Sequence, residues 1–136
     1  MAALTSWAPW LWAYGAALLT LGVLDGVWLG FLARNFYQRE MVAVAAESFR
    51  VAPAVLFYLG YPAGVLALAL HPLPAGLGEA ALRAGLVGLV AYATYDLSNM
   101  ATLKAWSLQL VLVDVAWGIA LSAAMGGVAY NVLRRF

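Results

Sequence analysis

Four long apolar segments constrain this chain more than any other feature of its sequence. They cover approximately residues 9–33, 51–70, 79–97 and 108–133. Because the hydrocarbon core of a bilayer is about 30 Å thick, ~20 residues of helix are enough to cross it. Lipid offers no water to the backbone, so each crossing segment must be helical. The sequence therefore predicts an all-α integral membrane protein, folded as a four-helix antiparallel transmembrane bundle with short loops.

The composition excludes several other classes of protein. Hydrophobic residues make up 66% of the 136 residues and charged residues 10%, and a soluble domain of this size has too little interior for so much apolar surface. A net charge of +1 provides no electrostatic footprint for nucleic acid. The chain has no cysteine, which excludes disulfides and thiolate catalysis. No linker interrupts residues 1–136, so we expect a single four-span transmembrane domain.

The connections between the segments are short, apart from residues 34–50. That stretch alternates charged and apolar residues, which is typical of a helix lying in the membrane interface, here at 37–49. Glu79 and Arg83 are spaced to form an ion pair in the first turn of the third segment. Ser107 has the position and chemistry of a helix N-cap. The basic residues are divided almost equally between the two membrane faces, so they leave the orientation open.

Three aspartates lie in or at the ends of the apolar segments: Asp25, Asp96 and Asp114. Ionisable groups inside a membrane are costly and often functional. Small residues recur at helical spacing on the same predicted faces: Gly22, Gly26 and Gly30, then Gly60 and Gly64, then Gly85 and Gly88, then Gly118, Ser122 and Gly126. Because small residues let membrane helices approach closely, we expect these stripes to pack, within the chain or across a homodimer.

The alternation of four spans places all three aspartates beneath one membrane face. The sequence therefore predicts a dry, tightly packed opposite half and, beneath that face, a polar, mostly acidic pocket. The aromatic residues expected around this pocket are Trp28, Tyr58, Tyr92, Tyr95 and Trp117. The candidate ligand-binding residues are Asp25, Trp28, Tyr95, Asp96, Asn99, Lys104, Asp114 and Trp117. No metal-ligand spacing or cofactor motif is present, so we expect neither a metal nor a cofactor. A purely structural role also remains open, because each aspartate could simply cap a helix or hold a neighbouring one.

Four blocks of the sequence resemble a small bacterial family of membrane proteins without an established activity, DUF2177. The blocks are LDGVWLG at 24–30, FYLGY at 57–61, YDLSNMATLKAW at 95–106 and DVAWG at 114–118. The third block is the most specific of them. The resemblance covers nearly the whole chain. It implies four spans and a multi-pass location in the bacterial inner (cytoplasmic) membrane.

Three functions fit these observations. In the first, the pocket binds or processes a small amphipathic or lipid-like ligand drawn from the membrane lipids, and whether it catalyses a reaction is left open. In the second, the acids couple protons to transport of a small solute, with an oligomer formed through the glycine stripes and a wet path reaching His71. In the third, the chain is a structural accessory subunit of a membrane enzyme, with a solid interior and its acids neutralised by Arg34, Arg50 and Lys104.

Overall fold

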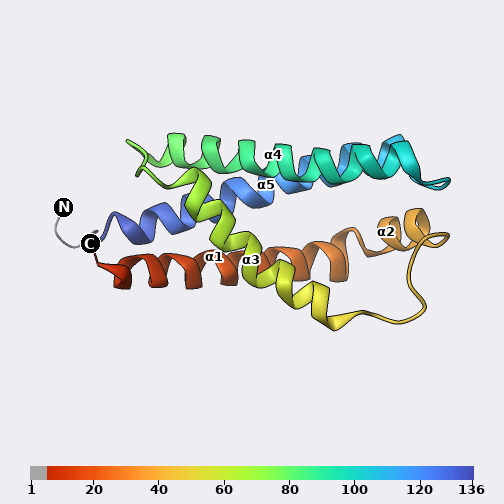
Figure 1. Ribbon diagram of the computed structural model, residues 1–136, viewed down its shortest axis with the longest axis horizontal. Coiled ribbons are helices and arrows are strands. Elements are labelled where there is room, and N and C mark those ends of the chain that lie inside the picture. Colours follow the sequence, from red (N-terminus) through yellow and green to blue (C-terminus); the bar gives the residue numbers. More distant parts are fainter. Residues whose placement is uncertain (1–5) are drawn as a thin grey trace.

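The computed structural model describes residues 6–136, and within that range every regular element is helical (Figure 1). The elements are α1 (Trp7–Val27), a π-helical turn (Trp28–Leu32), α2 (Arg34–Met41), α3 (Val51–Ala69), α4 (Leu77–Thr102) and α5 (Leu108–Leu133). The all-α prediction is confirmed, and the four long helices match the four apolar segments.

Three helices are long and apolar enough to cross a membrane: α1 together with its π turn, α3 and α5. Helix α4 has 26 residues, as many as α5, but it is more polar. Glu79 and Arg83 in its first turns, and Asp96 and Asn99 near its end, account for this difference.

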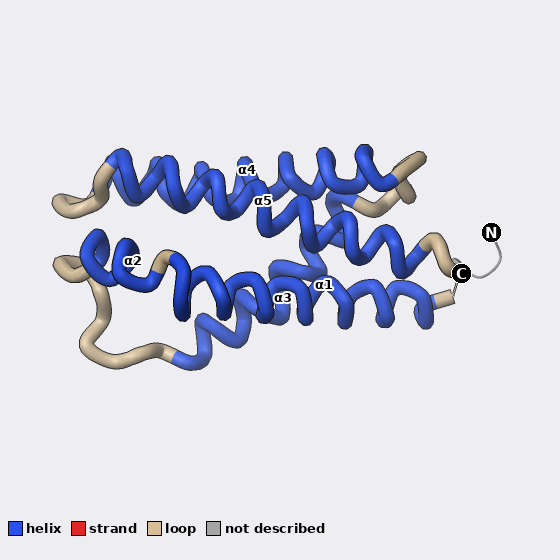
Figure 2. The backbone as a smooth tube through the Cα atoms, turned by 180° about the vertical axis from the view of Figure 1, so that it is seen from behind, coloured by secondary structure: helices blue, strands red, loops and turns tan. Residues whose placement is uncertain are grey.

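The helices alternate in direction, and both described ends of the chain lie at the same end of the molecule (Figures 1 and 2). Helices α1, α4 and α5 run roughly along the long axis, whereas α3 crosses α1 obliquely on its way to the start of α4. The most extensive packing is between α4 and α5, followed by that between α1 and α5. Because α3 runs obliquely, its first half stands apart from the second half of α4 (Figure 1).

Glycines bring α4 and α5 into close contact. A Cβ atom on Gly88 would collide with the Gly118 carbonyl and with the side chain of Ser122, and a Cβ on Gly126 would collide with Ala84. The predicted close packing of these stripes is confirmed, because only glycine permits this separation of the two backbones.

Within the described chain, the glycine stripes of the first two segments do not pack against another helix. A Cβ on Gly22, Gly26 or Gly30 of α1, or on Gly60 or Gly64 of α3, would meet no described atom within 4 Å. On α1, the residues that face the bundle are those one position before the glycines in the sequence. The buried residues of α1 are Pro9, Ala13, Ala17, Leu21 and Asp25, spaced every four residues. Asp25 is therefore buried as expected, but the glycines beside it face outward.

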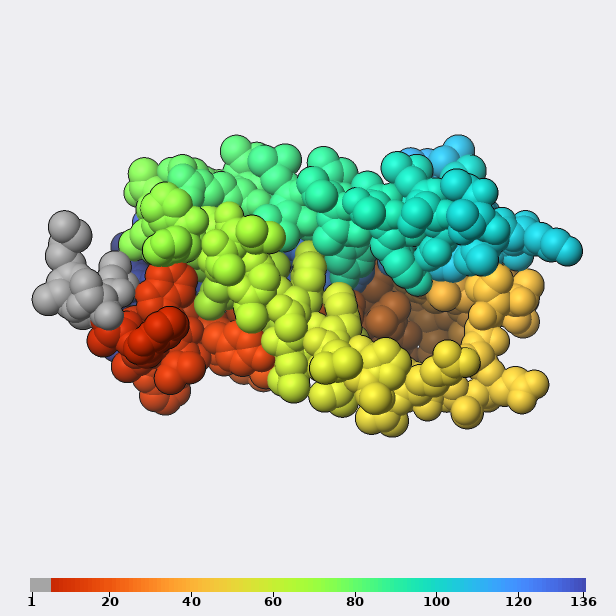
Figure 3. Space-filling view, viewed as in Figure 1, coloured from red at the N-terminus to blue at the C-terminus, as the bar shows by residue number. Residues whose placement is uncertain are grey.

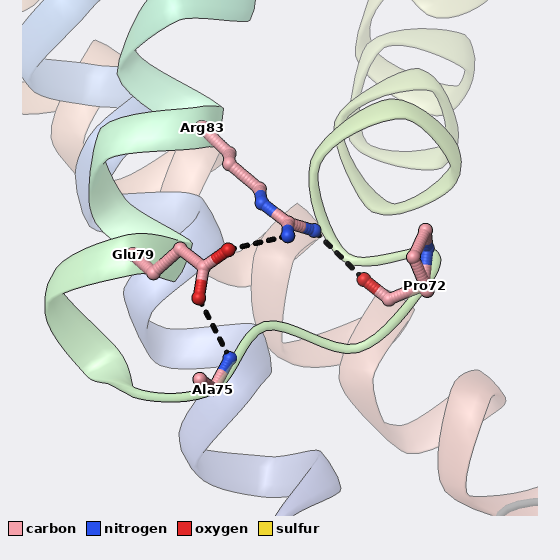
Figure 4. Close-up of polar contacts among 4 residues, drawn as sticks. All are labelled: Pro72, Ala75, Glu79 and Arg83. Carbon is pink, nitrogen blue, oxygen red and sulfur yellow. Dashed lines mark hydrogen bonds and ion pairs between the residues drawn. The ribbon is translucent and has the colours of Figure 1, made fainter.

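The half of the bundle that holds the chain ends has an apolar core. Its fully buried members include Leu21 of α1, Val65 of α3, and Leu121 and Met125 of α5. The turn from α3 to α4 closes this half (Figure 4). Arg83 pairs with Glu79 as predicted and donates to the Pro72 carbonyl at 2.8 Å, and the Ala75 amide donates to Glu79 at 2.9 Å.

The short helix that follows the first apolar segment lies earlier than predicted. It is α2, over 34–41 rather than 37–49, and residues 42–50 are exposed and not helical. Helix α2 starts almost directly after the π turn and ends where the Ser107 hydroxyl donates to Glu40 at 2.5 Å. Residues beyond it must then bridge the distance to α3. Ser107 also caps α5 as predicted, by accepting a hydrogen bond from the Leu110 amide at 3.0 Å.

The glycine contacts generate a test of the α4–α5 interface. We expect Gly126→Ala to lower the free energy of unfolding by about 1–3 kcal/mol, because the added methyl group overpacks against Ala84. Gly22→Ala is the matched control, since its methyl group meets no neighbour. Thermal unfolding in detergent, followed by circular dichroism, measures both. Equal melting temperatures for the two variants would contradict the close approach of α4 and α5.

Candidate functional site

Asp25 joins three helices at the polar end of the bundle. Its side chain is buried, with an exposed fraction of 6%. Its Oδ2 accepts a hydrogen bond from the Tyr58 hydroxyl of α3 at 2.8 Å, and its Oδ1 accepts one from Nε1 of Trp117 of α5 at 2.9 Å. A buried carboxylate is tolerated only when donors replace the lost water, and here α3 and α5 supply one donor each.

The neighbouring aromatic residues continue this network to Asp114. The rings of Trp28 and Trp117 are stacked, with centroids 4.5 Å apart and an interplanar angle of 8°. Nε1 of Trp28 donates to the Tyr37 hydroxyl at 3.2 Å, and that hydroxyl donates to Oδ1 of Asp114 at 2.7 Å. Helix α2, which lies outside the spanning segments, therefore contributes a side chain to the interior of the site.

Asp96 is fully buried beside Asp114. Nε1 of Trp106 donates to Oδ1 of Asp96 at 3.3 Å, and the carboxyl group of Asp114 lies within hydrogen-bonding reach of Asp96. Among the described residues, no donor reaches Oδ2 of Asp96. The two acids thus form a carboxyl pair in which Oδ2 of Asp96 accepts no hydrogen bond from the described residues.

A cavity of about 440 Å³ adjoins Asp114. It is lined by Phe57 and Tyr61 of α3, Ala91, Tyr92 and Tyr95 of α4, and Asp114 of α5. Helices α3 and α4 form its walls, and Figure 3 shows the surface hollowed between the yellow part of α3 and the cyan part of α4. The oblique course of α3 produces this opening on the side of the bundle.

The structure brings together five of the predicted site residues: Asp25, Trp28, Asp96, Asp114 and Trp117. Tyr95 also belongs to the site, because it lines the cavity. Asn99 is half-buried, one helical turn beyond Tyr95.

Lys104 does not join the site, contrary to the prediction. It lies exposed in the link between α4 and α5, and no ion pair connects it to an acid in the described chain. Arg34 and Arg50 are likewise exposed. In the described part of this end of the bundle, the ion pair present is Arg39–Glu40, at 4.0 Å. Hydroxyl and indole groups, rather than cations, therefore hold the three aspartates.

Two donors of the network, Tyr37 and Trp106, escaped the sequence analysis. Tyr37 lies beyond the π turn, which interrupts the helical repeat and so prevents spacing from placing it. Trp106 lies after the end of α4, and its indole reaches back ten residues to Asp96. A signal for Trp106 was available, because it closes the same sequence block that contains Asp96.

The fold and the site together define a helical membrane protein with a buried acidic and aromatic cluster. A family model described as a predicted membrane protein, DUF2177, matches residues 10–131, so the chain belongs to this family. The resemblance noted from the sequence blocks is thus confirmed. No curated protein and no solved structure matches the chain.

The role of Tyr37 can be tested by removing its hydroxyl. We expect Tyr37→Phe to lower the free energy of local unfolding of α2 by about 1–3 kcal/mol, because it removes a hydrogen bond to a carboxylate. Hydrogen–deuterium exchange of residues 34–41 should then become faster. Tyr130→Phe is the control, since this buried tyrosine makes no hydroxyl hydrogen bond within the described chain. Unchanged exchange in Tyr37→Phe would show that α2 is held by other contacts.

The same hydroxyl predicts a pH dependence. Burial is the main cause that raises the pKa of Tyr37 above its ordinary value of 10.0, and its hydrogen bond to Asp114 acts in the same direction. Because the folded state favours the protonated phenol, this contribution to stability is complete below pH 10 and declines as the pH rises above it. The difference in tyrosinate absorbance between parent and Tyr37→Phe should therefore develop only above pH 10; development below that value would contradict the burial.

Proposed function

We propose that this protein is a four-span bacterial inner-membrane protein, a single domain, whose pocket binds a small amphipathic or lipid-like ligand. Helix α4 is the fourth span in this proposal. Its 26 residues extend to about 39 Å, which exceeds the hydrocarbon thickness, and it packs along the equally long α5. Its charged residues favour this assignment, because Glu79 and Arg83 pair near one end and Asp96 is buried inside the bundle.

The cavity beside Asp114 is the observation that carries the proposed function. Its volume of about 440 Å³ falls within the range of small-molecule sites. Four aromatic side chains line it, and Asp114 provides the single charged group. An amphipathic molecule would therefore place its polar head at Asp114 and its apolar body between α3 and α4. The sideways opening supports entry from within a leaflet.

The arrangement gives less support to the two alternatives. Transport needs a path to the opposite face, but that half is closed by fully buried side chains such as Leu21, Val65 and Met125. A purely structural role predicts acids neutralised by cations and a solid interior. Here the acids are held by aromatic donors and a cavity remains beside them.

Native mass spectrometry of the purified protein tests the pocket. We expect the parent to retain a membrane-derived ligand and Ala91→Leu to lose it, because the larger side chain fills the cavity. Asp114→Asn should weaken retention by removing the charge at the polar end.

The matched control for Ala91→Leu is Ala120→Leu, which adds the same side chain at an exposed position of α5 away from the cavity. It should retain the ligand as the parent does. Equal retention by the parent and by Ala91→Leu would remove the pocket from consideration.

A further inference from the structure

We propose that the pocket selects a cationic ligand, an amphiphile with an ammonium head, and that binding of this head expels a proton held between Asp96 and Asp114. The inference rests on the proposed function, because it names the class of ligand that the same cavity takes. Three independent features of the site support it: the charge around the cavity, the aromatic walls, and the incomplete hydrogen bonding of Asp96.

The charge around the cavity favours a cation. Asp114 is the single charged residue in its lining, and it is only half-buried. The cationic side chains near this end are exposed and form no ion pair with the three aspartates of the described chain; they are Arg34, Arg39, Arg50 and Lys104. A phosphate or carboxylate head would therefore meet a like charge with no compensating partner. An ammonium head would meet an opposite charge in a region of low dielectric constant.

The walls have the chemistry that recognises ammonium groups. The rings of Phe57 and Tyr61 are stacked with centroids 5.3 Å apart, and Tyr61 meets Tyr92 edge to face at 6.1 Å. Tyr95 completes the lining on the α4 side. Aromatic faces attract cations through the ring quadrupole, and several rings around one space form the usual site for a quaternary ammonium.

The hydrogen bonding of Asp96 is incomplete if both Asp96 and Asp114 are ionised. Asp96 is fully buried, and within the described residues Oδ2 has no donor, while its neighbour Asp114 is itself a carboxyl group. Two ionised carboxylates in contact and without a cation repel each other. One proton between them removes the repulsion and supplies a hydrogen bond between the two carboxyl groups. The pair then carries one negative charge in total.

The exchange follows from this charge balance. An ammonium head beside Asp114 adds one positive charge, which stabilises both carboxylates in their ionised forms. The shared O–H bond breaks, its electron pair stays on the carboxylate, and the proton passes to water. The N–C or N–H bonds of the ligand do not change. Because the proton and the ammonium compete for the same pair, the affinity for the cation should rise with pH.

The other titratable groups near the pair do not supply this proton. They are Asp25 of α1, Tyr37 of α2, Tyr58 and Tyr61 of α3, and Tyr92 and Tyr95 of α4. Asp25 already accepts hydrogen bonds from Tyr58 and Trp117, so its carboxylate is satisfied without a proton. Tyr37 donates to Asp114 and is a neutral phenol at ordinary pH. The proton is therefore assigned to Asp96 and Asp114.

Titration calorimetry of the full-length protein in a neutral detergent tests the inference. The probes share one chain length and differ in head charge: decyltrimethylammonium, decanol and decyl sulfate. The quaternary head has no proton of its own to release. We expect the cation to bind at least about tenfold more tightly than the other two, from its Coulombic and cation–π contacts. In buffers of different ionisation enthalpy, we expect release approaching one proton per cation bound, with affinity rising as pH increases.

Two variants separate the roles of the two acids. Asp96→Asn leaves the charge of Asp114 and supplies an amide donor in place of the proton, so the cation should still bind, without proton release and without the pH dependence. Asp114→Asn should abolish the preference for the cation. Glu47→Gln, which removes an exposed carboxylate in the 42–50 segment, is the control and should behave as the parent does.

The outcomes distinguish the two proposals, and the parent alone suffices if a variant does not fold. If decanol or decyl sulfate binds as tightly as the cation, and Ala91→Leu abolishes that binding, the pocket stands and the cationic selectivity is wrong. If the cation is preferred but no proton is released, the exchange is wrong. If no probe binds above the protein-free blank, or Ala91→Leu binds all three as the parent does, the pocket itself is wrong.

Discussion

The rest of this structure depends on how carboxylates are kept inside a bundle without cations. Asp25, Asp96 and Asp114 each accept a hydrogen bond from an aromatic side chain: Tyr58 and Trp117 donate to Asp25, Trp106 to Asp96 and Tyr37 to Asp114. In a medium without water, such donors replace hydration while their rings remain compatible with apolar neighbours. The acids and the aromatic cluster are therefore one feature, and each requires the other.

The helices do not contribute equally to this arrangement. Helices α4 and α5 are joined along close backbone contacts that only glycine allows. Helix α3 packs into the apolar core through residues such as Val65 in its second half, and individual hydrogen bonds hold the part before it. Tyr58 donates to Asp25, Tyr61 and Ser122 share a hydrogen bond at 2.5 Å, and the Leu59 carbonyl accepts one from Tyr14 at 2.7 Å. The cavity lies where this obliquely packed helix meets the tightly packed pair, so the site combines a fixed floor with a wall of fewer contacts.

The sequence predicts the helices and the end of the bundle at which the acids lie, because both depend on simple counts. The length of an apolar run sets a span, and the alternation of spans sets which ends share a membrane face. Which side of a helix faces inward is harder to predict. On α1, Ala13 and Ala17 offer small side chains as suitable for close packing as Gly22 and Gly26, and the structure buries the alanines. Periodicity identifies a stripe but not its partner.

Contacts made by residues that follow a break in a helix cannot be predicted from helical spacing. The π turn over Trp28–Leu32 alters the rotation per residue, so the position of Tyr37 next to Asp114 depends on the backbone geometry rather than on spacing. Lys104 illustrates the opposite error. It is close in sequence to Asp96, but the link that carries it leaves its side chain exposed.

The lateral opening between α3 and α4 has a consequence for how any ligand would be delivered. A molecule that enters from the side arrives by two-dimensional diffusion within one leaflet, and its concentration at the opening is set by its partition between water and lipid. The bilayer would then make a first selection, for amphipathic molecules lying at the right depth, before the protein makes its own. Measured affinities would accordingly depend on the lipid composition as well as on the pocket.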